Sequence, residues 1–184
     1  MKLLIKNGRI VDPSQNLDKV MDLLLADGKV AKLAEHITDV ADETYDASGK
    51  VVAPGFIDMH THMREPGLEA KESIRTGTMA AAAGGITTIA CMPNTKPAVS
   101  NSIVVTGIKA RAAEEGYANV EVIGSISKDQ KGTELAEMGD MLEKGAVAFS
   151  DDGHYVDSSR LLLNAARYIS NFGAPLISLS LIHI

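Results

Sequence analysis

The spacing of apolar and polar residues changes near residue 54. Before that point, short apolar runs alternate with turn dipeptides, a pattern that predicts antiparallel strands. Asn7-Gly8 and Asp27-Gly28 favour two-residue hairpin turns because both positions tolerate a positive φ. Ser48-Gly49-Lys50 separates a third pair of runs. We therefore expect three successive hairpins that form a small antiparallel β unit over residues 1–53.

After this unit, apolar strands alternate with amphipathic helices. The expected strands cover residues 55–62, 86–92, 119–127, 146–150 and 174–177, and the expected helices cover residues 71–83, 99–115, 133–144 and 158–171. Strands that are apolar along most of their length are typical of a parallel sheet covered on both faces, hence of an α/β fold. An open doubly wound sheet and part of a (β/α)₈ barrel both fit this order. A closed barrel takes about 250 residues, so residues 54–184 would supply only its first four to five βα units, a truncated N-terminal half.

The composition indicates a globular protein but does not identify its function. The chain has 184 residues, 45% of them hydrophobic, with 18 basic and 24 acidic residues and a net charge of -6. These values argue against disorder, and the acidic balance argues against nucleic acid or a membrane surface as the main partner. Cys91 is the single cysteine. It excludes an intrachain disulfide, fits a cytoplasmic location and is expected to be a buried core thiol. No apolar run reaches the roughly 18 residues of a membrane span.

The strongest chemical motif is Asp58-Met59-His60-Thr61-His62, at the end of the first strand after residue 54. Alternate side chains of a strand share a face, so His60 and His62 are expected about 6.5–7 Å apart on the same side. Two imidazoles at that spacing can bind one divalent ion, and zinc sites commonly add a carboxylate. Such a pair also occurs by chance, but the apolar run before it and its place at the strand's carboxyl end favour a metal site.

Polar residues follow three of these strands. Arg64, just beyond the histidines, could bind a carboxylate through its guanidinium or be a solvated loop residue. Asn94 could bind a polar substrate through its amide or simply form a turn after Pro93. Asp152 is a candidate metal ligand that could bridge two ions, while one aspartate of the Asp151-Asp152 pair is expected to serve a turn or a cap. The remaining histidines are not assigned to the site: His36, His154 and His183.

In this order, the motifs resemble those of the dihydroorotases, a family of the amidohydrolase superfamily. The resemblance rests on Pro54 to Gly67 (PGFIDMHTHMREPG), Gly84 to Thr88 (GGITT), Met92 to Thr95 (MPNT) and Phe149 to Gly153 (FSDDG), and extends to about Ile177. It implies a TIM barrel combined with a small β-sandwich domain. It points to the bacterial type, in which an aspartate bridges the two metal ions in place of a carboxylated lysine.

The resemblance also implies a reaction and a set of roles. The reaction is the zinc-dependent, reversible interconversion of (S)-dihydroorotate and N-carbamoyl-L-aspartate in pyrimidine biosynthesis, with two Zn²⁺ in a complete site. His60 and His62 would bind the first ion, Asp152 would bridge both, and His62, Arg64 and Asn94 would contact the substrate. Expected partners are a second copy of the chain or aspartate transcarbamoylase. The alternatives are an allantoinase or hydantoinase, and a non-catalytic partner of aspartate transcarbamoylase.

The sequence departs from the family pattern at its end. A histidine ligand of the second metal is expected where the chain has Leu179, and residues 180–184 do not continue the family motif. The resemblance places another histidine and the catalytic aspartate beyond residue 184. We therefore expect no catalytic residue within this chain, at most a partial metal site, and no useful turnover. Half a barrel would also expose sheet edges and apolar faces, which favours aggregation.

Overall fold

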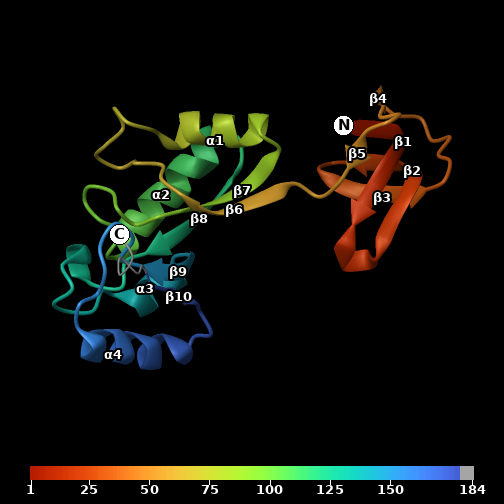
Figure 1. Cartoon of the computed structure of the whole chain (residues 1–184). Coiled ribbons are helices and arrows are strands. Elements are labelled where there is room, and N and C mark those ends of the chain that lie inside the picture. The colour runs from red at the N-terminus through yellow and green to blue at the C-terminus, as the bar shows by residue number, and fades with distance from the viewer. Residues whose placement is uncertain (179–184) are drawn as a thin grey trace. The chain divides into compact units, whose positions relative to one another are not determined.

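The computed structural model describes residues 1–178. The chain divides into two compact units, Met1–Pro54 and a second that begins at Gly55 (Figure 1). None of the helices within residues 1–178 combines the length and the apolarity that a bilayer crossing requires.

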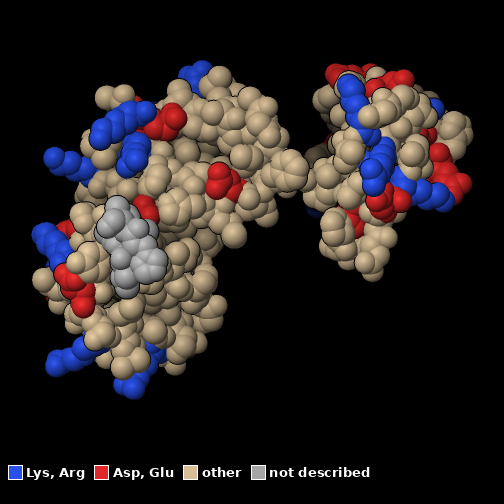
Figure 2. All heavy atoms as spheres, viewed as in Figure 1, with Lys and Arg blue, Asp and Glu red and all other residues tan. Residues whose placement is uncertain are grey.

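The N-terminal unit is a five-stranded mixed sheet. Its elements are β1 (Lys2–Asp12), the short 3₁₀ helix η1 (Pro13–Gln15), β2 (Leu17–Ala26), β3 (Lys29–Ala34), β4 (Glu43–Asp46) and β5 (Val51–Val52). β2 pairs antiparallel with both β1 and β3, while β4 and β5 pair parallel with β1. Figure 2 shows basic and acidic side chains interleaved over this unit, so neither sign forms a continuous patch on that face.

Only one of the three predicted hairpins forms. Asp27-Gly28 joins β2 to β3 with φ values of 50° and 75°, as predicted. Asn7-Gly8 instead lies within β1, where the register against β2 shifts between Ile5 and Gly8. Asn7 has a φ of 58°, and its N–H donates to the buried carboxylate of Asp22 at 2.9 Å. The prediction of a turn was wrong because a carboxylate on the neighbouring strand satisfies this amide, which produces a β-bulge in a continuous strand.

The third predicted hairpin was also wrong. The runs on either side of Ser48-Gly49-Lys50 become β4 and β5, and each pairs with β1 rather than with the other. The lack of a side chain at Gly8 lets β5 pair with β1, because a Cβ at Gly8 would lie only 2.6 Å from Val52 Cγ2. The unit is therefore a mixed sheet instead of a purely antiparallel one.

The second unit is a curved, parallel five-stranded sheet with helices between successive strands (Figure 1). Its elements are β6 (Phe56–Thr61), α1 (Ile74–Ala83), β7 (Ile86–Cys91), α2 (Ser102–Glu115), β8 (Asn119–Gly124), the 3₁₀ turn η2 (Lys128–Gln130), α3 (Met138–Glu143), β9 (Ala146–Ser150), α4 (Ser159–Ser170) and β10 (Leu176–Ile177). The strand order is β10-β9-β8-β7-β6, and every neighbouring pair is parallel. This is the strand–helix order of an incomplete barrel.

The helices begin later than the apolar pattern predicts. The side chain of Ser73 caps α1 and that of Asn101 caps α2, so both helices start three residues after the predicted point. α3 is shorter still, because Leu135 pairs with Ser127 in an antiparallel bridge before the helix starts. Strand positions agree more closely with the prediction, since each expected strand overlaps an observed one.

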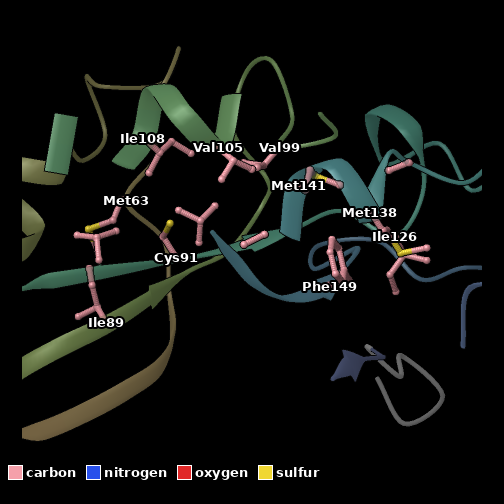
Figure 3. Close-up of a cluster of buried hydrophobic side chains, with 14 of the residues drawn as sticks. Met63, Ile89, Cys91, Val99, Val105, Ile108, Ile126, Met138, Met141 and Phe149 are labelled. Carbon is pink, nitrogen blue, oxygen red and sulfur yellow. The ribbon is translucent and has the colours of Figure 1, made fainter. Parts of the chain in front are cut away.

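The main hydrophobic core lies between the sheet and its helices (Figure 3). Strand residues such as Ile89, Cys91 and Phe149 pack there with helical residues such as Val105 and Met141, all buried. Burial raises the pKa of the Cys91 thiol to about 11. Cys91 is thus the buried core thiol that was predicted.

β6 forms one edge of the described sheet. Three apolar side chains on it remain exposed: Phe56 and Ile57 at 66% and Met59 at 74%. An exposed apolar edge of this kind favours pairing with another chain.

Candidate metal centre

The carboxyl end of β6 carries the histidine pair. The rings of His60 and His62 lie edge to face, with their centroids 5.3 Å apart. The ladder between β6 and β7 is irregular from Asp58 to Thr61. Asp58 does not join the pair, because its carboxylate accepts a hydrogen bond from the His60 N–H at 3.1 Å. The strand end therefore presents two imidazoles to the space above the sheet.

Asp152, directly after β9, completes a group of three. Its Oδ1 lies 3.4 Å from His60 Nε2, and its Oδ2 lies 3.5 Å from His62 Nε2. Each residue offers one ligand atom such that all three atoms lie within 4.8 Å of one another. Two ligands bound tetrahedrally to zinc at about 2.0–2.1 Å are about 3.3 Å apart, so this spacing and the N,N,O donor set fit one divalent ion. The structure thus brings the three predicted ligands together, and their binding of metal stays a prediction.

Asn94, in the loop after β7, contacts one histidine of the pair directly. Its Oδ1 lies 2.9 Å from His62 Nδ1. With the amide oxygen facing the ring, His62 donates from Nδ1, and Nε2 is the ring nitrogen on the side of Asp152. The sequence predicted Asn94 as a substrate contact and missed this orienting role, because nothing in the spacing of residues 62 and 94 pairs them.

Arg64 lies in the loop after β6, with a φ of 59°. The next residue, Glu65, anchors this loop: its Oε2 accepts from the Ile74 N–H at 2.9 Å, and its Oε1 lies 3.0 Å from Arg111 Nε. The backbone of Arg64 therefore lies in an anchored loop two residues after His62. Its contact with a substrate carboxylate stays a prediction.

The loops after β6 and β7 are joined to each other. The Lys96 N–H donates to Pro66 O at 2.9 Å. A Cβ at Gly67 would lie 1.9 Å from Lys96 O, so only glycine permits this approach. The loop of Arg64 and the loop of Asn94 therefore form one layer beside the histidines.

The two adjacent aspartates have different roles. Asp152 faces the histidines, whereas the buried carboxylate of Asp151 accepts hydrogen bonds from the backbone N–H groups of Ile126 and Ser127. One of the two was expected to serve a turn or a cap, but the Asp151 carboxylate instead binds the backbone of the loop after β8. Which of the two it would be could not be predicted, because the choice depends on the loop after β8.

The other histidines lie elsewhere. His154 lies two residues after Asp152 and is outside the group of three. His36 is in the N-terminal unit, where its Nδ1 lies 3.7 Å from Asp22. Leu179 and His183 lie outside the described residues.

Comparison with known proteins identifies the family. Residues 49–178 match the family model described as dihydro-orotase-like. The chain belongs to the dihydroorotase-like family. Among its relatives, the dihydroorotase of Geobacter sulfurreducens is 51% identical over 179 residues, and that of Pelotomaculum thermopropionicum is 52% identical over 178. Each match covers 97% of this chain and 42% of the relative, so this dihydroorotase-like chain spans less than half the length of these proteins.

Solved structures agree with the barrel architecture. An L-hydantoinase (dihydropyrimidinase) from Arthrobacter aurescens superimposes with a TM-score of 0.82 at 28% identity, over 95% of this chain and 39% of the hydantoinase. A crystal structure of a dihydroorotase matches with a TM-score of 0.65 over 95% of this chain and 50% of that chain; at 13% identity, this likeness concerns the fold alone. The predicted fold class, an incomplete TIM barrel preceded by a small β unit, is confirmed for this dihydroorotase-like chain.

Proposed function

We propose that this chain forms the metal-binding N-terminal part of a dihydroorotase, which hydrolyses (S)-dihydroorotate reversibly to N-carbamoyl-L-aspartate in pyrimidine biosynthesis. The observation that carries the proposal is the convergence of His60, His62 and Asp152 at the carboxyl end of a barrel sheet, in a chain of the dihydroorotase-like family. Active sites of such barrels are built at this end of the strands.

In the proposal, His60, His62 and Asp152 bind Zn²⁺, and Asp152 also serves a second ion in the complete site. A divalent ion at such a site supplies Lewis acidity, which lowers the pKa of water toward about 7 and polarises a carbonyl. Asn94 keeps the Nε2 lone pair of His62 directed at the site through its contact with Nδ1. Arg64 binds the substrate carboxylate and so fixes the ring for attack.

A chimaera tests this proposal. Residues 1–178 would replace the corresponding part of the Geobacter sulfurreducens relative, and the purified protein would be assayed for carbamoyl-aspartate formation and zinc content. We expect zinc-dependent turnover of dihydroorotate, its loss in Asp152→Asn, and no turnover by the 184-residue chain alone. A folded chimaera without zinc or activity would refute the proposal.

A hydantoinase-like activity is the second candidate, favoured by the TM-score of 0.82 to the Arthrobacter enzyme. Dihydroorotate carries a carboxylate that hydantoin lacks, so the two candidates differ in their need for Arg64. Rates of the same chimaera on dihydroorotate, hydantoin and allantoin would discriminate between them. Preference for hydantoin or allantoin would replace the first proposal with the second.

Arg64→Ala should impair the acidic substrate selectively. We expect KM for dihydroorotate to rise about 10–100-fold, because a hydrogen bond to a charged group contributes about 1.5–3 kcal/mol. Steady-state kinetics of the chimaera would measure this change, with Arg75→Ala on the exposed side of α1 as the matched control. An unchanged KM in Arg64→Ala would exclude Arg64 from carboxylate recognition.

A further inference from the structure

The backbone around Asp152 forms a closed turn. The His154 N–H donates to Asp151 O at 2.8 Å, so residues 151–154 form one hydrogen-bonded turn with Asp152 at its second position. Gly153 follows with a φ of 88°, a conformation that suits glycine. A Cβ built on Gly153 would lie 3.5 Å from Asn94 Nδ2, so this turn lies against the loop after β7.

The carboxylate of Asp151 joins this turn to the loop after β8. Oδ1 accepts from the Ile126 N–H at 2.8 Å and from the Ser127 N–H at 3.1 Å, and Oδ2 accepts from the Ser127 hydroxyl. Ser127 Oγ accepts in turn from the Gly132 N–H at 2.8 Å. Asp151 is 3% exposed, so these hydrogen bonds replace the water that the carboxylate lost on folding.

The same loop also contacts Asp152 itself. Gln130 Nε2 donates to Asp152 O at 3.0 Å. To reach it, the loop turns back through Asp129 and Gln130, whose φ values are 52° and 56°. Residues other than glycine rarely adopt this backbone conformation, so other contacts must hold the loop in it. These contacts are the hydrogen bonds between Asp151 and Ser127 at the start of the loop and the one from the Gly132 N–H at its end.

We propose that Asp151 is a positioning residue for Asp152, which it holds in the orientation that metal binding requires. This inference rests on the proposed function, because it takes Asp152 as a metal ligand. Asp151 fixes the turn from one side and the Gln130 loop fixes the carbonyl of Asp152 from the other, so only the side-chain torsions of Asp152 remain free. A ligand held in this way binds metal without first losing backbone freedom.

The test measures Co²⁺ binding to the 184-residue chain by calorimetry and visible absorption, together with amide hydrogen exchange of the metal-free chain. We expect Asp151→Ala to weaken Co²⁺ binding about 10–100-fold, the usual effect of removing a residue that supports a metal ligand. Asp151→Asn keeps an oxygen for both backbone N–H groups, so this variant should lose less Co²⁺ affinity than Asp151→Ala. Asp129→Asn, an exposed aspartate of the same loop, is the matched control and should bind as the unmodified chain does.

The outcomes separate positioning from general stability. A purely structural role would lower the unfolding temperature of Asp151→Ala but leave Co²⁺ affinity unchanged in the folded chain, and that result would overturn the inference. Should Asp151→Ala fail to fold, Ser127→Ala removes one of the three hydrogen bonds to the Asp151 carboxylate, together with the one from the Gly132 N–H. Weaker Co²⁺ binding than in Asp129→Asn would then support the inference, and equal binding would overturn it.

Hydrogen exchange separates the inference from the proposed function. If the unmodified chain binds no Co²⁺, the proposed metal centre fails, yet the turn can still be examined without metal. Faster exchange of the His154 amide in Asp151→Ala or Ser127→Ala than in Asp129→Asn would support Asp151 as the residue that holds the turn. Equal exchange would overturn that role as well.

Discussion

At the scale of single residues, His62 has a polar neighbour at each ring nitrogen. Asn94 Oδ1 lies 2.9 Å from Nδ1, and Asp152 lies 3.5 Å from Nε2. Neither contact could be read from the sequence, although all three residues were singled out there as polar groups at strand ends. Spacing along a strand could place His60 beside His62, but the partners of the His62 ring come from loops 32 and 90 residues further on, and only the folded sheet brings them together.

Asn94→Ala should therefore weaken metal binding without removing a ligand. We expect Co²⁺ affinity of the chain to fall at least about tenfold, because His62 loses the partner that fixes its tautomer and orientation. Calorimetric titration would measure the fall, with Asn164→Ala on the exposed side of α4 as the control. Equal affinities for the two variants would contradict an orienting role for Asn94.

Cys91 should be unreactive in the folded chain. Burial raises the pKa of its thiol to about 11, so at pH 8 only about one thiol in a thousand is the reactive thiolate. Labelling with a thiol reagent at pH 8 should be slow in native buffer and should become rapid in concentrated urea. Rapid labelling of the folded chain would show that the strand around Cys91 opens.

At the scale of elements, two similar dipeptides have different outcomes. Asp27-Gly28 and Asn7-Gly8 both predict a two-residue turn, and both adopt a positive φ at the first residue. Only the first is a hairpin turn, because Asp22 lies opposite Asn7 and accepts its N–H. Strand positions could be predicted from apolar runs, but strand pairing in the N-terminal unit depends on this buried carboxylate and on Val52, both distant in sequence.

Asp22 should make the N-terminal unit sensitive to acid. Burial alone would raise its pKa, but hydrogen bonds from the Asn7 and Ile37 N–H groups, with Lys6 and His36 nearby, outweigh this effect and lower the pKa below 3.8. A lowered pKa means that the stabilisation is complete above the unfolded value and is lost as pH falls through the folded value. We expect stability to fall below about pH 4.

Asp22→Asn provides the comparison. It should destabilise the N-terminal unit by about 2 kcal/mol at neutral pH, because the hydrogen bonds lose their charged acceptor. The difference from the unmodified chain should shrink as the pH falls below 3.8, the ordinary value for this carboxyl. Hydrogen exchange of the Ile37 amide across this pH range would measure both effects. A constant difference would rule out titration of Asp22 as the cause.

At the scale of the whole molecule, the sheet of the second unit ends in an apolar edge, within the part that the structure describes. Ile57 on β6 is 66% exposed, and Val20 on β2 is 60% exposed. Ile57→Lys should reduce self-association of the chain, because a charge on an edge strand opposes pairing with a second chain. Sedimentation velocity would measure this, with Val20→Lys as the control for added charge. Equal self-association of both variants would show that another surface causes the self-association.

Gly67 links the loop of Arg64, which is proposed to bind the substrate carboxylate, with the loop of Asn94, which contacts the His62 ring. Any larger residue there would meet Lys96 O, and the loops of Arg64 and Asn94 would have to separate. Neither loop can therefore be redesigned alone. Attempts to broaden substrate range by lengthening one of them would also disturb the histidine, so changes of specificity in this scaffold need paired alterations in both segments.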